Sequence, residues 1–243
     1  MHIAPEVLFQ IGIFNITNTL LFTLIVDAVI LTASFFIVKN IQIVPRLFQN
    51  GVEMVIQTSY ETVESIAGNK AAKIFPYFMS FFIFILLSNW LSLLPGIGTI
   101  GFFEENEGHR VLSPILRGST SDINVTLGLA LVSVAATHIL SIKTLGIVEY
   151  LTRYFSINPI NLFIGVLEII SEITKIISLS FRLFGNIFAG EVVLHTVSSL
   201  FAFVFPLPFL FLEMIVGFVQ ALVFAMLTMA FMAILTTSHS EAH

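Results

Sequence analysis

The sequence contains no cysteine and few charged residues. Asp, Glu, Lys and Arg make up 10% of its 243 residues, whereas a soluble domain has about 25%. Without cysteine, disulfides, cysteine-bound metals and cysteine nucleophiles are excluded. The net charge of −5 and the lack of a basic cluster argue against nucleic-acid binding. Hydrophobic residues account for 57%, which predicts an integral membrane protein in which residues 1–243 form a single membrane domain.

Motifs of soluble enzymes are also missing. No HExxH, P-loop or GxGxxG pattern stands in a suitable context. The C-terminal "SHSEAH" is interpreted as a solvated tail rather than a metal site. No cofactor or metal is therefore expected. The N-terminal "MHIAPEVLFQIGIFNITN" lacks the basic region that begins a cleaved signal peptide, so the first apolar run is expected to be a retained span.

Apolar segments long enough to cross the hydrocarbon core, which needs about 20 residues, recur along the chain. They cover residues 18–38, 74–95, 123–142, 160–201 and 206–237. The last two exceed a perpendicular span, so we expect long tilted helices that form a hairpin at "FPLP". The predicted fold class is an all-α integral membrane protein with about five crossings.

Residues 41–67 have a different pattern. Glu53, Gln57, Glu61 and Glu64 share one helical face, at spacings of three and four. This pattern predicts an amphipathic helix that lies in the membrane interface or packs on the bundle.

Basic residues in the loops predict the orientation. Between the first and second spans lie Lys39, Arg46, Lys70 and Lys73, and between the third and fourth lie Lys143 and Arg153. Loops rich in Lys and Arg remain on the inner side of the membrane. We therefore expect the N-terminus outside and the C-terminus inside.

The segment 160–201 carries charged and polar residues along one line. Together with Leu179, that line joins at spacings of four and three the residues Glu168, Glu172, Lys175, Arg182 and Asn186. It is about 27 Å long at 1.5 Å per residue, close to the hydrocarbon thickness. Glu191 and His195 lie on roughly the opposite face, farther toward the outside. The helix is thus predicted to have two polar surfaces, with Arg182 between them in depth.

This layout indicates a mechanism of ion transfer. Arginine stays charged at any physiological pH, so Arg182 cannot relay protons by titrating. It can attract a carboxylate or interrupt a continuous water wire, whereas glutamate and histidine can load and release protons. Two half-paths separated by a fixed cation require a moving carboxylate on a partner chain. In the last segment, Gln220 follows Glu213 by two turns and is expected near the depth of Arg182.

Four segments together resemble subunit a of the F-type ATP synthases, from about residue 74 to the C-terminus. They are "SFRLFGNIFAGEVV", "EMIVGFVQALVFAMLTMAF", "LLSNWLSLLPG" and "TSDINVTLGLALV". The resemblance implies a static channel subunit beside a rotating ring of c subunits, with two proton half-channels separated by an essential arginine. The family motifs match Arg182, Asn186, Glu191, Glu213 and Gln220.

The resemblance implies further roles and partners. Asp122 and Asn124 match the border of the outer half-channel, and Glu168 and Glu172 match the inner one. His195, judged from the sequence position alone, is either part of the outer path or an interfacial side chain. The implied partners are the c-subunit ring, the peripheral-stalk b subunits, the rest of the ATP synthase and the lipid bilayer. ATP chemistry would occur on other chains. A bacterial plasma membrane is favoured over the mitochondrial inner membrane.

Several residues keep a structural alternative. Arg182 could pair with Glu168 or Glu172, while Glu191, Glu213 and Gln220 could join helices by hydrogen bonds. Lys175 could extend to the inner interface, His138 could be bundle packing, and Asp27 could be packing or a partner contact. The competing functions are a small secondary transporter and an intramembrane enzyme. The transported ion, the ring size and the working direction remain open.

Overall fold

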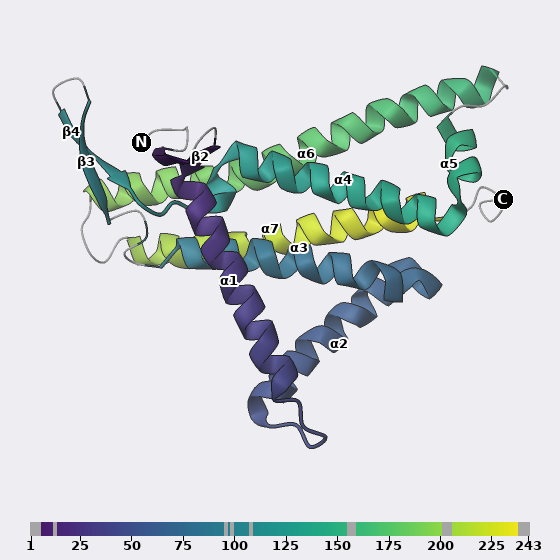
Figure 1. Cartoon of the computed structure of the whole chain (residues 1–243), viewed down its shortest axis with the longest axis horizontal. Helices are drawn as coiled ribbons and strands as arrows, with labels where there is room; N and C mark the ends of the chain where they lie inside the picture. Colours follow the sequence, from purple (N-terminus) through teal and green to yellow (C-terminus); the bar gives the residue numbers. More distant parts are fainter. Residues whose placement is uncertain are drawn as a thin grey trace. The chain divides into compact units, whose positions relative to one another are not determined.

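The computed structural model describes residues 6–11, 14–94, 97, 100–106, 109–154, 159–200 and 206–237 (Figure 1). Its long helices are α1 (Asn18–Lys39), α2 (Leu47–Ala67), α3 (Ala71–Ser92), α4 (Ile123–Leu145), α6 (Pro159–Leu200) and α7 (Pro206–Leu235). A short helix, α5 (Ile147–Tyr154), lies between α4 and α6. Two antiparallel hairpins are formed by β1 (Val7–Ile11) with β2 (Phe14–Thr17) and by β3 (Gly101–Asn106) with β4 (His109–Pro114).

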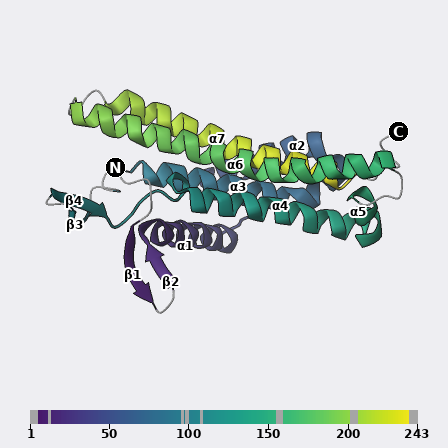
Figure 2. The same cartoon turned by 90° about the horizontal axis from the view of Figure 1, so that it is seen from above.

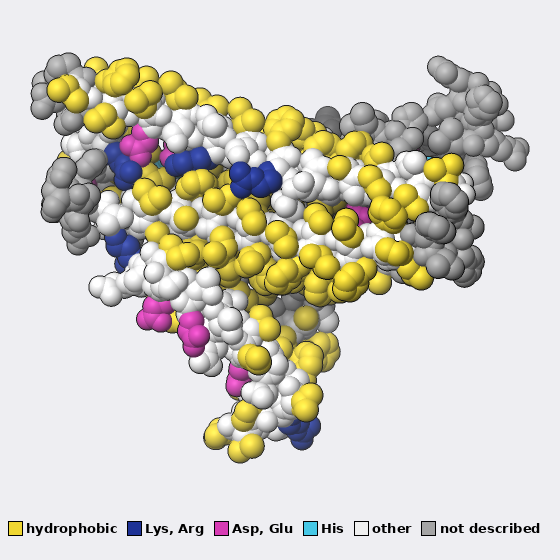
Figure 3. Space-filling view, turned by 180° about the vertical axis from the view of Figure 1, so that it is seen from behind, with side chains coloured by type: hydrophobic (Ala, Val, Ile, Leu, Met, Phe, Trp, Pro, Cys, Tyr) yellow, Lys and Arg dark blue, Asp and Glu magenta, His cyan; other side chains and the backbone are white. Residues whose placement is uncertain are grey.

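Four stretches of the described helices are long and apolar enough to cross a membrane. They are Asn18–Lys39, Leu47–Ser92, Ile123–Leu145 and Pro206–Leu235. The 42-residue α6 is the remaining long helix, and it carries five charged side chains. Figure 3 shows hydrophobic side chains over most of one face, with few charged groups between them. The predicted class of all-α integral membrane protein is confirmed, with two small hairpins added.

The helix ends follow from local sequence. Both α6 and α7 begin at a proline, Pro159 and Pro206, whose fixed φ suits the first helical position. The amphipathic helix expected over 41–67 starts only at Leu47, because a proline at position 45 disfavours helical conformation before it. Gly146, with φ of 87°, separates α4 from α5 in a conformation that glycine adopts without strain. Some predicted features lie outside the described residues. They are the expected helix ends at Pro95 and residue 201, residue 205 of "FPLP", and the tail 238–243.

The chain forms two compact units, and parts of α3, α4, α6 and α7 belong to each. Unit 1 comprises residues up to Val44, Phe82–Thr126 and Leu183–Leu222. Its polar centre is Asn89 on α3, which donates to the Gly217 carbonyl of α7 at 2.9 Å and accepts from Thr120 Oγ1 at 2.7 Å. Trp90 Nε1 donates to the Met214 carbonyl at 3.1 Å. These bonds connect α3 to α7 and to the loop before α4.

Unit 2 comprises Pro45–Phe81, Leu127–Arg182 and the chain from Val223 onward. Its apolar core includes Ile74 and Phe78 of α3 with Met229 and Met232 of α7, all almost completely buried. Hydroxyl groups join helices inside this core. Ser133 and Thr228 lie 2.8 Å apart, and Ser141 Oγ donates to the Leu235 carbonyl at 2.7 Å. Such bonds satisfy polar groups where hydrocarbon offers no partner.

The helices α6 and α7 are antiparallel, as Figure 2 shows. In unit 1 the Glu213 carboxylate of α7 lies against Gly190 of α6. In unit 2 the Lys175 ammonium of α6 lies 4.6 Å from the centre of the Phe231 ring of α7. Along α6 Gly190 follows Lys175, whereas along α7 Glu213 precedes Phe231. The two helices therefore have opposite directions, and the predicted hairpin of the last two helices is confirmed.

Substitution of Gly165 tests the packing of α5 on α6. An added Cβ would collide with the Tyr154 carbonyl, a backbone group that cannot rotate away. We expect Gly165→Ala to destabilise the protein by about 1–3 kcal/mol. The measurement is the midpoint of thermal unfolding in detergent. The control is Gly128→Ala, where nothing lies within 4 Å of the added Cβ. Equal midpoints for the two variants would contradict this packing.

Candidate functional site

Arg182 lies on an exposed part of α6. Its guanidinium donates to Ser178 Oγ on the same helix at 3.3 Å, and it forms no ion pair within the described part of the chain. Its neighbours Ile177 and Phe181 are 50% and 56% exposed. The predicted alternative, a structural pair of Arg182 with Glu168 or Glu172, is therefore wrong for this chain alone.

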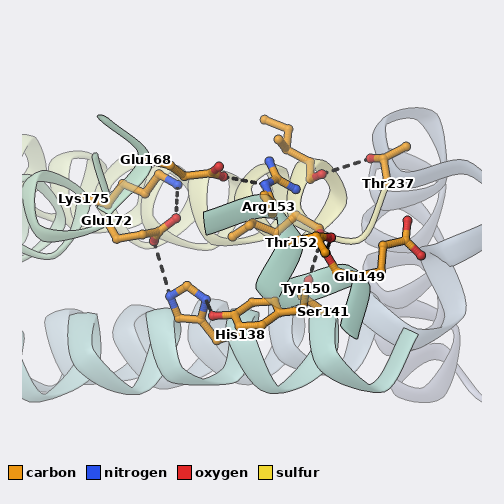
Figure 4. Close-up of polar contacts among 12 residues, drawn as sticks. His138, Ser141, Glu149, Tyr150, Thr152, Arg153, Glu168, Glu172, Lys175 and Thr237 are labelled. Atoms are coloured by element: carbon orange, nitrogen blue, oxygen red, sulfur yellow. Dashed lines mark hydrogen bonds and ion pairs between the residues drawn. The ribbon is translucent and has the colours of Figure 1, made fainter. Parts of the chain in front are cut away.

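A polar cluster in unit 2 occupies the contact between α4, α5 and α6 (Figure 4). We call it the α4–α5–α6 cluster, and its members are His138, Tyr150, Arg153, Glu168, Glu172 and Lys175. The two glutamates predicted for the inner path are both in it.

Each glutamate of this cluster is paired with a cation. Arg153 Nε donates to Glu168 Oε1 at 2.7 Å, and Lys175 Nζ donates to Glu172 Oε1 at 2.7 Å. Lys175 thus does not extend alone to the interface. Arg153 was missed as a site residue because it lies outside the predicted spans. In the sequence, Arg153 was noted only as one of the basic loop residues that predict the inner side of the membrane.

His138 joins the cluster from α4. Its Nδ1 lies 3.0 Å from the Tyr150 hydroxyl, and its Nε2 lies 3.6 Å from Glu172 Oε2. In Figure 4 the imidazole ring lies between these two side chains. His138 is therefore more than bundle packing, and Tyr150 is a second residue that sequence analysis did not identify.

Tyr154, at the end of α5, has a buried side chain next to this cluster. Burial raises the pKa of its hydroxyl, and the nearby Tyr150, Glu168 and Glu172 add to the rise. Tyr154 therefore stays protonated throughout the physiological range.

A pair of carboxylates, Glu191 and Glu213, lies in unit 1, and we call it the outer carboxylate pair. Glu213 is buried, and its Oε1 lies 2.7 Å from the position that a Cβ on Gly190 would take. The absent side chain at Gly190 thus leaves room for this carboxylate. The charges of Glu191 and Glu213 act on one another.

The loop before α4 contacts Glu191. A Cβ at Gly118 would lie 3.2 Å from Glu191 Oε1, and the Ser121 hydroxyl donates to the Gly118 carbonyl at 2.9 Å. The charge of Arg117 acts on Glu191. Glu191 Oε2 is buried and has no hydrogen-bond partner among the described residues. A buried carboxylate oxygen without a donor suits a proton or a bound water. Arg117 and Ser121 carry no motif by which the sequence could have marked them.

Asp122 has a structural task at the start of α4. Its carboxylate accepts from Thr19 Oγ1 of α1 at 2.9 Å and from the Asn124 backbone N–H at 2.9 Å. The Asn124 side chain donates to it at 3.1 Å. Asp122 is thus a buried N-cap that also holds α1. A role of Asp122 and Asn124 in the outer path remains a prediction.

The other predicted residues make no hydrogen bond or ion pair within the described structure. Asn186 and His195 on α6 are exposed, and Gln220 on α7 is half-buried, as is Asp27 on α1. The structure does not bring His195 to the outer carboxylate pair by any hydrogen bond. Among the described residues, no group of three or more His, Asp or Glu could hold a metal ion.

Comparison with known proteins gives consistent matches over nearly the whole chain. The ATP synthase A chain family matches residues 20–233. ATP synthase subunit a of Syntrophobacter fumaroxidans is 35% identical over 236 residues, which cover 95% of this chain and 89% of that protein. ATP synthase subunit a of Moorella thermoacetica is 29% identical, covering 98% and 99%, and ATP synthase subunit a 2 of Acaryochloris marina is 29% identical, covering 96% and 92%. The chain belongs to the ATP synthase A chain family.

Proposed function

We propose that this chain is the ion-translocating stator subunit of the membrane sector of an F-type ATP synthase. It provides two offset proton half-channels separated by Arg182. It passes protons to and from the carboxylates of a c-subunit ring, and so couples proton flow to ATP synthesis or ATP-driven pumping. Membership of the ATP synthase A chain family supports this proposal, as do the names of the relatives.

The observation that carries the proposal is the exposed Arg182 without an ion-pair partner. A guanidinium at the centre of a membrane is costly unless it is paired or hydrated. Neighbouring apolar side chains such as Phe181 offer it no compensation, and Glu168 and Glu172 are bound to other cations. A carboxylate that arrives on a partner helix would compensate the charge. A ring that presents one carboxylate after another meets this requirement repeatedly.

The remaining site residues follow as two paths. The outer carboxylate pair, Glu191 and Glu213, exchanges protons with the outer solution, with His195, Asp122 and Asn124 at its border. Glu168 and Glu172 belong to the inner path. Asn186 and Gln220 are neutral amides that orient Arg182 and its partner without adding charge.

The proposed setting is a complete ATP synthase. The ring covers the exposed face of α6, and peripheral-stalk b subunits hold the chain against rotation. ATP chemistry occurs on other subunits. The bacterial sources of the similar proteins favour a bacterial plasma membrane.

Replacement of Arg182 tests the separation of the half-channels. In inside-out vesicles that carry the complete complex, we expect Arg182→Ala to abolish ATP-driven acidification. After the catalytic head is stripped, passive proton leak should persist or rise, because the two paths are no longer separated by a fixed cation. Arg182→Lys should also impair pumping, since a lysine ammonium does not reproduce the planar guanidinium.

The matched control is Arg46→Ala, which removes an exposed arginine at the start of α2 and should leave pumping unchanged. Pumping by Arg182→Ala near the unmodified rate would overturn the proposal.

Substitution of Gly190 tests the outer carboxylate pair without removing an ionisable group. The added methyl of Gly190→Ala would lie 2.7 Å from Glu213 Oε1, so this flexible carboxylate must move. We expect normal assembly and a several-fold loss of ATP-driven pumping. The measurement is initial acidification rate per assembled complex, with Gly128→Ala as control. A wild-type rate in Gly190→Ala would show that the position of Glu213 is unimportant.

A further inference from the structure

Among the carboxylate, basic and imidazole side chains of the α4–α5–α6 cluster, His138 is the one without an ion pair at 2.7 Å, since its distance to Glu172 is 3.6 Å. The inference drawn from it rests on the proposed function and concerns the inner path. It names the residue that exchanges protons there.

The carboxylates of the cluster are poorly placed for this task. Glu168 accepts from Arg153 at 2.7 Å, and Glu172 accepts from Lys175 at 2.7 Å. A proton on either of these oxygens would displace a charge-assisted hydrogen bond, which is a strong one. Arg153 does not lose its proton in a protein, and Tyr154 stays neutral because its pKa is raised by burial.

His138 has the opposite properties. Imidazole is the side chain that ordinarily changes charge between about pH 5 and 8. The His138 side chain is 23% exposed, so it is not sealed inside the helix packing. The 3.6 Å separation from Nε2 to Glu172 Oε2 is too long for a direct hydrogen bond.

The two neighbours of the ring define its tautomer. Glu172 Oε2 is an acceptor, so it favours a hydrogen on Nε2, and the Tyr150 hydroxyl then donates to Nδ1. When the ring takes a second proton, Nδ1–H donates to the Tyr150 oxygen and Nε2–H still faces Glu172. Nδ1 therefore has the same hydrogen-bond partner, the Tyr150 hydroxyl, in both protonation states.

We infer that His138 is the proton-exchanging residue of the inner path. A proton enters when the Tyr150 hydroxyl transfers its hydrogen to Nδ1 and takes another from the inner solution. A proton leaves from Nε2 to a water beside Glu172. One proton is moved, Tyr150 ends as it began, and a flip of the ring returns its remaining hydrogen to the side of Glu172. Tyr150 is a positioning residue that also carries the proton to the ring.

The charges that face His138 are balanced. The helix α6 contributes Glu168, Glu172 and Lys175, and α5 contributes Tyr150 and Arg153, with the neutral Tyr154 beside them. From α7, the apolar Phe231 ring lies against the Lys175 ammonium. On α4 itself, Lys143 is exposed. Two anions and two cations thus form pairs, and uptake of a proton by His138 changes the net charge by one.

The test uses inside-out vesicles that carry the complete complex, from which the catalytic head is then stripped. In these vesicles the face of the membrane that is inner in the cell is exposed to the medium. Passive proton flux is driven by a potassium–valinomycin potential and recorded at medium pH values from about 5 to 8, the range in which imidazole titrates. His138→Gln keeps hydrogen-bonding capacity but cannot titrate. We expect a several-fold lower flux and a flatter dependence on medium pH. Tyr150→Phe should lower the flux, and added imidazole should restore flux in His138→Ala.

The control is Glu149→Gln, which removes an exposed charge on the same short helix and should behave as wild type. Wild-type flux in His138→Gln, or a uniform loss with unchanged pH dependence and no rescue by imidazole, would overturn the inference. Arg182→Ala provides the separate test of the proposed function. If that variant cannot pump while His138→Gln is normal, the proposed function stands and only the role of His138 fails.

Discussion

The cost of a charge in hydrocarbon governs this structure. An ionisable side chain within a membrane helix must be paired, hydrated or covered by another chain. Glu168 and Glu172 meet this requirement with Arg153 and Lys175, both at 2.7 Å. Arg182 does not meet it within the described chain. The proposed function explains its position on α6 by a partner rather than by the fold.

The ionisable residues thus fall into two groups with different tasks. The Arg153–Glu168 pair joins α5 to α6, the Glu172–Lys175 pair lies within α6, and Asp122 caps α4 and binds Thr19 of α1. Two other groups keep an unused bonding position among the described residues. Glu191 has a buried oxygen without a donor, and His138 has a nitrogen 3.6 Å from its nearest carboxylate. An unused position is what a group needs to accept and release a proton, so in the proposed function the stable pairs surround the sites where protons move.

Much of the fold could be predicted from the sequence, because a long apolar run determines a membrane helix almost by itself. The pairing of the site residues could not. The sequence predicted Arg182 as the alternative partner of Glu168, whereas the actual partner, Arg153, comes from α5, a short helix that carries no span signal. The same holds for Tyr150, which reaches His138 from that helix. Helical periodicity shows which residues share a face of one helix. Contacts between helices depend on how the connecting loops orient one helix against another, which periodicity does not show.

The central claim is that Arg182 faces a carboxylate of another chain. The most direct measurement is the distance from its guanidinium to the nearest carboxylate of a partner subunit, in a cryo-EM structure of the complete complex in a bilayer. The account predicts about 4–6 Å in at least one rotational state, the range in which opposite charges act strongly on each other. A guanidinium that faces lipid, or only carboxylates of its own chain, in every state would contradict it.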